Sequence, residues 1–77
     1  MTGTEERLIE AIRTIQAKGT SLEEISASCG TYKQNLSAFM LGKRGAQIRW
    51  IETACTVYGF SPEWLLTGRG EKEKLNK

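Results

Sequence analysis

The residues that could do chemistry in this chain are cations gathered in one stretch that lacks acids. Residues 25–51 contain no aspartate or glutamate and carry Lys33, Lys43, Arg44 and Arg49. The part of the chain before this stretch holds five acids, at Glu5, Glu6, Glu10, Glu23 and Glu24. A local surplus of positive charge attracts phosphate groups, even though the net charge of the chain is only +2. A solvated charged face is the alternative interpretation of the same pattern.

Other site chemistries find little support in the sequence. The chain has no histidine, which excludes an imidazole base or ligand. Its two cysteines, Cys29 and Cys55, are too few for a thiolate zinc site and form no CxxC motif. Both fall at apolar positions of predicted helices, so we expect buried, reduced thiols and no disulfide. We therefore expect no enzyme activity, no metal or other cofactor, and no small-molecule substrate.

Length and composition indicate one small soluble domain. The 77 residues are 39% hydrophobic and 26% charged, which is typical of a globular chain. No stretch approaches the ~20 apolar residues that a membrane span needs. Residues 1–6 are polar and acidic, so we expect no signal peptide and predict a cytoplasmic protein.

The spacing of apolar residues predicts five helices and no strand. Capping patterns mark helix starts at Thr4, Ser21, Thr31 and Ser61. The fourth helix is expected over residues 46–58. Glycines mark the helix ends, at Gly19, Gly30, Gly42, Gly59 and Gly68. We assign residues 1–70 to the helical domain and residues 71–77 to a charged, solvated tail.

The apolar positions predict which side of each helix faces the core. They are Leu8, Ile12 and Ile15 in the first helix, Leu36, Phe39 and Met40 in the third, and Ile48, Ile51, Cys55 and Tyr58 in the fourth. Leu41 is expected to be exposed. Trp50 lies off the apolar stripe of the fourth helix, and three placements stay open: the edge of the core, a contact with a second subunit, or a position near DNA beside Arg49.

The joint between the second and third helices is the most informative feature. Two short helices are separated by little more than Gly30, and so tight a turn forces a large crossing angle, as in helix-turn-helix units. This arrangement leaves four polar or small side chains pointing outward, Lys33, Gln34, Ser37 and Ala38. Such side chains suit the edges of bases in a DNA major groove. An ordinary helical hairpin with a polar outer face is the alternative.

The chain resembles the helix-turn-helix domain of the lambdoid phage repressor and Cro family, within the wider xenobiotic-response-element-like group of regulators. The resemblance covers residues 7–70 and is carried by residues 21–26, 29–31, 36–37, 42–44 and, most specifically, 58–68. It implies a compact, all-α, five-helix domain with the helix-turn-helix at its second and third helices. In that fold Trp64 is expected to fill the base of the core.

The resemblance also assigns roles on DNA. It places the third helix in the major groove, with Lys33, Gln34, Ser37 and Ala38 as base-reading residues. The residues it brings near phosphates are Ser21, Tyr32, Asn35, Lys43 and Arg44. We add Arg49 as a phosphate contact, with a solvent-facing arginine as the equal alternative. Phosphate contacts would set the register on DNA, and the base contacts would set the sequence.

The chain departs from the family pattern in three places. Leu22 stands where many members have a phosphate-gripping glutamine, and Tyr32 replaces a small serine or threonine. The third departure is a pair, because Ile15 and Met40 occupy positions where the family often has a buried arginine–glutamate ion pair. Stranding one charge of such a pair costs about 3–5 kcal/mol, whereas an apolar pair is often neutral or stabilising. We therefore predict that Ile15 and Met40 touch.

These observations favour a sequence-specific, double-stranded DNA-binding regulator, a phage or prophage repressor or Cro-like protein near the nucleoid of a bacterial host. One recognition helix reads few base pairs, so we expect a homodimer on a palindromic operator. No cleavable C-terminal domain is expected, and the dimer contact is expected around the fifth helix and Phe60. The alternative is a protein-interaction module of the same fold, such as an antirepressor or antitoxin, with weak or no DNA binding.

Overall fold

In a computed structural model that describes residues 2–73, the chain folds into five helices and, within those residues, no strand. They are α1 (Gly3–Ala17), α2 (Leu22–Ser28), α3 (Lys33–Met40), α4 (Ile48–Thr56) and α5 (Pro62–Thr67). The radius of gyration is 11.4 Å, which matches the ~11.5 Å expected for a compact domain of this length. The prediction of an all-α domain is confirmed.

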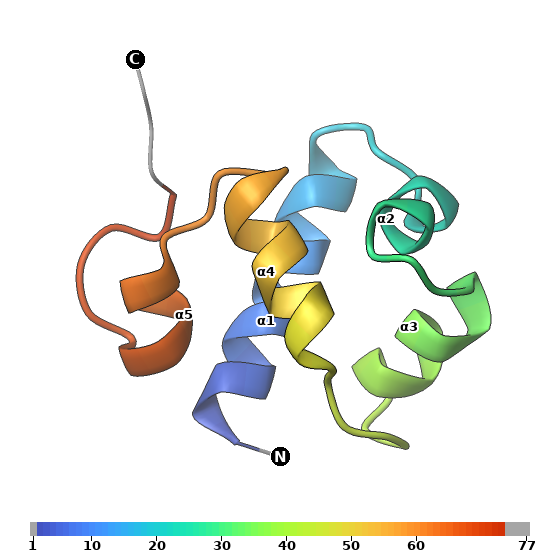
Figure 1. Cartoon of the computed structure of the whole chain (residues 1–77), viewed down its shortest axis with the longest axis horizontal. Helices are drawn as coiled ribbons and strands as arrows, with labels where there is room; N and C mark the ends of the chain where they lie inside the picture. The colour runs from blue at the N-terminus through green and yellow to red at the C-terminus, as the bar shows by residue number, and fades with distance from the viewer. Residues whose placement is uncertain (1, 74–77) are drawn as a thin grey trace.

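The longest helix, α1, forms the centre of the molecule together with α4 (Figure 1). The α2–α3 pair lies on one side of this centre and α5 on the other (Figure 1). Helix α1 packs against α2, α4 and α5, and α2 packs against α3. Arg7 ties α1 to α5, because its Nε donates to the carbonyl oxygen of Leu65 at 2.9 Å. In the described part of the chain, no helix has the length and apolar character that a membrane crossing requires.

Local capping explains where most helices begin. Ser21 caps α2 in a full capping box with Glu24, and Ser61 caps α5 with Pro62 at the first helical position, as predicted. The predicted start of α1 at Thr4 is wrong, because the cap of α1 is Thr2. A capping box needs a glutamate three residues after the cap, and Glu5 stands at that distance from Thr2.

The start of α3 also differs from the prediction. Its N-cap is Tyr32, whose side chain makes no capping hydrogen bond, so the predicted cap at Thr31 is wrong. The Thr31 hydroxyl instead accepts a hydrogen bond from Asn35 Nδ2 at 2.8 Å. Asn35 lies one helical turn after Thr31, which brings its amide within reach while Gln34 points outward.

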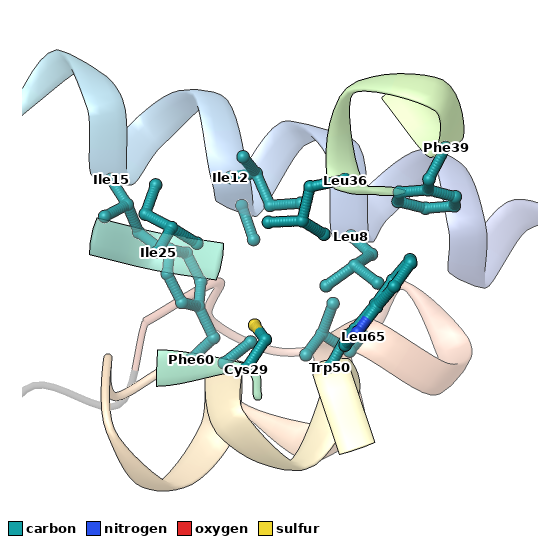
Figure 2. Close-up of a cluster of buried hydrophobic side chains, with 12 residues drawn as sticks. Leu8, Ile12, Ile15, Ile25, Cys29, Leu36, Phe39, Trp50, Phe60 and Leu65 are labelled. Carbon is teal, nitrogen blue, oxygen red and sulfur yellow. The ribbon is translucent and has the colours of Figure 1, made fainter. Parts of the chain in front are cut away.

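The core confirms the predicted faces of α1 and α3 and corrects that of α4. Leu8, Ile12, Ile15, Leu36 and Phe39 are all buried. Ile48, predicted to face inward, is 74% exposed, whereas Trp50 is only 1% exposed and packs on Phe39 with ring centroids 5.5 Å apart (Figure 2). Burying the indole removes more apolar surface from water than burying Ile48 would, which sets the rotation of α4.

The same rotation buries Thr53 and Ala54 and leaves Ile51, Cys55 and Tyr58 at the edge of the core. Burial of the polar Thr53 is tolerated because its hydroxyl donates to the carbonyl oxygen of Ser28 at 3.5 Å. Trp50 is therefore a core residue. Of its three predicted placements, the edge of the core comes nearest to the structure, but the side chain is buried more deeply than that.

Other predicted positions have mixed outcomes. Leu41 is 68% exposed, as expected. Ile15 is buried and Met40 is half-buried against the core, so neither faces water, while the contact between them stays a prediction. The dimer contact predicted around Phe60 cannot involve its side chain, because Phe60 is only 1% exposed. Leu65, and not the half-buried Trp64, fills the core beneath α5.

The segment after α5 is not a solvated tail throughout. The backbone N–H of Ser61 donates to the carbonyl oxygen of Lys72 at 3.0 Å, and Phe60 forms an isolated bridge with Glu73. Lys72 Nζ lies 2.9 Å from Glu10 Oε2, and Lys18 Nζ lies 2.6 Å from Glu73 Oε1. We call these two ion pairs the tail clasp. The rest of the predicted tail, residues 74–77, lies outside the described residues.

Candidate nucleic-acid interface

The turn between α2 and α3 fixes how α3 is presented. Gly30 has a φ of +73°, a left-handed conformation that favours glycine, and the N–H of Thr31 donates to the carbonyl oxygen of Ser26 at 3.0 Å. Ser26 is 1% exposed, and its small side chain allows the two helices to approach. On the inner side of α3, Leu36 and Phe39 are fully buried. The opposite side of α3 must therefore face outward.

This outward side brings together the four predicted base-reading residues. Lys33 and Gln34 are exposed, and Ser37 and Ala38 are half-buried. All four line one open surface hollow of about 370 Å³, together with Leu41 and Lys43. We call Lys33, Gln34, Ser37 and Ala38 the α3 face. The sequence did not single out Leu41 as a member of this surface, because its exposure alone carries no function.

A second hollow, of about 610 Å³, opens between α2 and α3. It shares Lys33 and Gln34 with the first and adds Tyr32, which is 76% exposed at the start of α3. Glu23 also lines this hollow, so its α2 side carries a negative charge. The surface is therefore electrostatically uneven, with carboxylate on the α2 side and cations toward the end of α3.

The cations toward the end of α3 belong to the loop that joins it to α4. The loop starts with a tight closure, because the N–H of Lys43 donates to the carbonyl oxygen of Ala38 at 2.8 Å. The Arg44 guanidinium carbon then lies 5.6 Å from the ring centroid of Trp50. The side chains of Lys43 and Arg44 line a third hollow, of about 300 Å³, together with Gly42, Gly45 and Glu5. We call residues 42–46 the basic loop.

Three further predicted phosphate contacts lie elsewhere and have intramolecular roles. The Ser21 hydroxyl accepts from the N–H of Glu24 at 3.1 Å, and Asn35 uses its amide on Thr31. Arg49 reaches across the α2–α3 turn, where its Nη1 lies 2.6 Å from the place a Cβ on Gly30 would occupy. Ser21, Asn35 and Arg49 line none of the three hollows described above. The structure thus groups the α3 face, Tyr32 and the basic loop, and sets these three apart.

Among the described residues, the cations of this surface form no ion pair with the carboxylates that line the same hollows. Within residues 2–73 the ion pairs are the two of the tail clasp, and neither includes Lys33, Lys43, Arg44 or Arg49. The acid-free stretch of the sequence therefore yields cations that remain available to an anionic partner.

No family model matches this chain, and no curated protein and no solved structure matches it. The resemblance to phage repressors thus stays a prediction that depends on the sequence motifs named above.

The described residues offer little for other chemistry. Among residues 2–73, no group of three or more histidine, cysteine or acidic side chains is placed to hold a metal ion. The two cysteines form no disulfide, and burial raises the pKa of the Cys29 thiol, which makes it a poor nucleophile. The arrangement is suited to binding an extended anionic surface through side-chain donors.

Proposed function

We propose that this chain is a sequence-specific, double-stranded DNA-binding regulator that inserts α3 into the major groove. The observation that carries the proposal is the hollow that the α3 face shares with Lys43, a cation that forms no ion pair with any carboxylate among residues 2–73. Hydrogen-bonding side chains beside an unneutralised cation match a base edge beside a phosphate.

Within this proposal the residues divide into two roles. Lys33 suits the acceptors of guanine, Gln34 suits adenine through its amide, and Ala38 suits a thymine methyl group. Lys43 and Arg44 contact phosphates, and Tyr32 contacts phosphate or sugar at the start of α3. We include in the proposal the helix-turn-helix arrangement of α2 and α3 and the repressor-like fold that the sequence motifs imply.

A homodimer on a palindromic site also belongs to the proposal, since one α3 face reads few base pairs. Phe60 is buried, so we place the contact between subunits on the outer surface of α5, where Leu66 is 57% exposed. Such a protein would act in a bacterial host as a phage or prophage repressor or a Cro-like regulator.

A salt titration tests the proposal. A dimer that contacts roughly 6–10 phosphates should lose affinity about 10³- to 10⁵-fold between about 50 and 200 mM salt. The measurement is fluorescence anisotropy with a mixed-sequence DNA duplex. Absence of binding at low salt would refute the proposal.

Selection of bound sites from random DNA separates the two roles. Gln34→Ala should relax the preference at one position of the selected site, because it removes a base contact. Lys43→Ala should weaken all sequences about equally, because it removes a phosphate contact. If both variants merely scale the affinity, the assignment of reading and anchoring residues is wrong.

One observation favours a second candidate, a protein-interaction module. Apolar side chains are exposed near the proposed DNA surface, with Tyr32 at 76%, Leu41 at 68% and Ile48 at 74%. Together with Glu23 in the α2–α3 hollow, they would suit a mixed apolar and basic site on another protein, such as an antirepressor or toxin. Trp50 is buried and adds nothing to this surface.

A further inference from the structure

We infer that Glu5, at the start of α1, is a positioning residue that holds the basic loop in place for phosphate contact. The inference deepens the proposed function and rests on it. A carboxylate is not expected to contact DNA directly, because it and the phosphates are both negatively charged. The role is indirect, because Glu5 acts through the backbone of the loop.

The basic loop has few hydrogen bonds of its own. Its first residues are closed onto α3 through the N–H groups of Gly42 and Lys43, at 2.9 and 2.8 Å. Beyond Lys43, the described hydrogen bond that ties the loop to another element runs from the N–H of Ala46 to Glu5 Oε2, at 3.1 Å. Glu5 and Ala46 are 41 positions apart in sequence, so this bond links the start of α1 to the end of the loop.

The Glu5 carboxylate is itself held in place. Its other oxygen, Oε1, accepts from the N–H of Thr2 at 2.9 Å, and its backbone N–H donates to the Thr2 hydroxyl. The two carboxylate oxygens thus have different backbone partners, one in the cap of α1 and one in the loop. A side chain fixed at both oxygens transmits the position of α1 to the loop.

The sequence of the loop fits this contact. Gly45 precedes Ala46, and a Cβ at Gly45 would lie only 3.3 Å from Glu5 Oε2. Glu5 also lines the same hollow as Lys43 and Arg44 without forming an ion pair with either, within the described residues. The carboxylate therefore fixes the backbone of the loop and leaves its two cations available.

If Glu5 positions the loop, its removal should weaken DNA binding, which is the opposite of the change expected from charge alone. Removing a negative charge close to DNA should strengthen binding to phosphate. Glu6 lies in the same turn of α1 and is exposed, so Glu6→Ala serves as the matched charge control. We expect Glu6→Ala to bind a mixed-sequence duplex at least as tightly as the wild type, whereas Glu5→Ala should bind about three- to tenfold more weakly, the range of one lost hydrogen bond.

A second readout needs no DNA. Hydrogen exchange of the Ala46 amide, followed by NMR on the free protein, should speed up about tenfold in Glu5→Ala and stay unchanged in Glu6→Ala. Glu5→Gln has one acceptor oxygen for the two backbone donors, Thr2 N–H and Ala46 N–H, so its exchange at Ala46 and its DNA affinity should lie between those of the wild type and Glu5→Ala. Thr2→Ala removes the cap hydroxyl but keeps the backbone N–H that donates to Glu5 Oε1, so its effects on exchange at Ala46 and on DNA affinity should be much smaller than those of Glu5→Ala.

The outcomes separate this inference from the function on which it rests. If the wild type shows no salt-dependent DNA binding, the proposed function fails and the inference with it. If the wild type binds and Glu5→Ala binds as tightly as Glu6→Ala, the inference alone is overturned. Unchanged exchange at Ala46 in Glu5→Ala, or an equal loss of affinity in Thr2→Ala, overturns it as well.

Discussion

Two regions of this molecule gather lysine and arginine side chains, and they use them differently. In the tail clasp, Lys18 and Lys72 are each paired with a glutamate, and Lys72 also donates to the Thr14 hydroxyl at 2.7 Å. In the basic loop, Lys43 and Arg44 are in neither of the described ion pairs. The clasp uses charge to attach the end of the described chain to α1, and the loop keeps charge available for a partner.

The difference teaches that a count of cations says little about function. Both regions are visible in the sequence as basic residues, and the residues after Gly68 even alternate lysine with glutamate. What separates them is how the nearby carboxylate of α1 is used. Glu10 pairs with Lys72 in the clasp, whereas Glu5, beside the basic loop, accepts from the Ala46 N–H and is in neither of the described ion pairs. The comparison yields four predictions, ordered by the expected size of the effect.

The largest effect is expected from the double substitution Lys43→Ala, Arg44→Ala. Loss of two phosphate contacts in each subunit should weaken DNA binding by roughly two orders of magnitude and lower the slope of log affinity against log salt. Circular dichroism should show an unchanged helical fold, because Lys43 and Arg44 are exposed. If the variant binds generic DNA as tightly as the wild type, the basic loop contacts DNA no more than the tail clasp does.

Gly30→Ala should destabilise the fold by about 1–3 kcal/mol, because alanine is strained at positive φ and its Cβ would meet Arg49. Gly70→Ala is the matched control, since Gly70 has a similar φ of +80° and an added Cβ there would meet only the Glu63 side chain, whose Oε1 would lie at an ordinary contact distance of 3.5 Å. Urea unfolding of both variants measures the difference. Equal losses would show that Arg49 moves away from the α2–α3 turn without cost.

In the clasp, Lys72→Ala should lower the free energy of unfolding by about 0.5–1 kcal/mol and leave DNA affinity unchanged. Its ion pair with Glu10 is partly exposed and worth little, and its position 5.7 Å from the Trp64 ring centroid adds a cation–π contact. Thermal unfolding and the DNA titration together check both halves of this prediction. A loss of DNA affinity would place the clasp within the binding surface.

The smallest effect is expected from mild acid. Hydrogen bonds from the backbone N–H groups of Thr2 and Ala46 hold the pKa of Glu5 below its ordinary value of 4.5. A folded-state pKa below the unfolded one contributes stability that is present above pH 4.5 and is lost as the pH falls through the lowered value. Chemical-shift titration should show Glu5 with a midpoint below 4.5.

How much could be read from the sequence depends on how local each feature is. The caps at Ser21 and Ser61 were predicted correctly because a cap is decided by residues within three positions. The predicted cap of α1 at Thr4 is wrong, because the residue three positions after Thr4 is Arg7, whereas Glu5 stands three positions after Thr2. The α3 face was also predicted, since the burial of Leu36 and Phe39 fixes the opposite side.

Features that depend on packing between distant segments escaped prediction. The rotation of α4 follows from how Trp50 meets Phe39, a contact between two helices that periodicity within one helix does not encode. Two further contacts join residues that lie far apart in the sequence. They are the ion pair of Lys72 with Glu10 and the hydrogen bond from the Ala46 N–H to Glu5. No spacing rule connects such residues before the fold is known.

The two tryptophans of this chain happen to mark the two regions compared above. Trp50 lies beneath Arg44 next to the basic loop, and its ring nitrogen is buried with no hydrogen-bond partner in the described structure. Trp64 lies beneath Lys72 at the clasp. Each region therefore contains its own intrinsic fluorophore, and the single-tryptophan variants Trp64→Phe and Trp50→Phe would let emission spectra follow DNA arrival and tail release separately, without an attached dye.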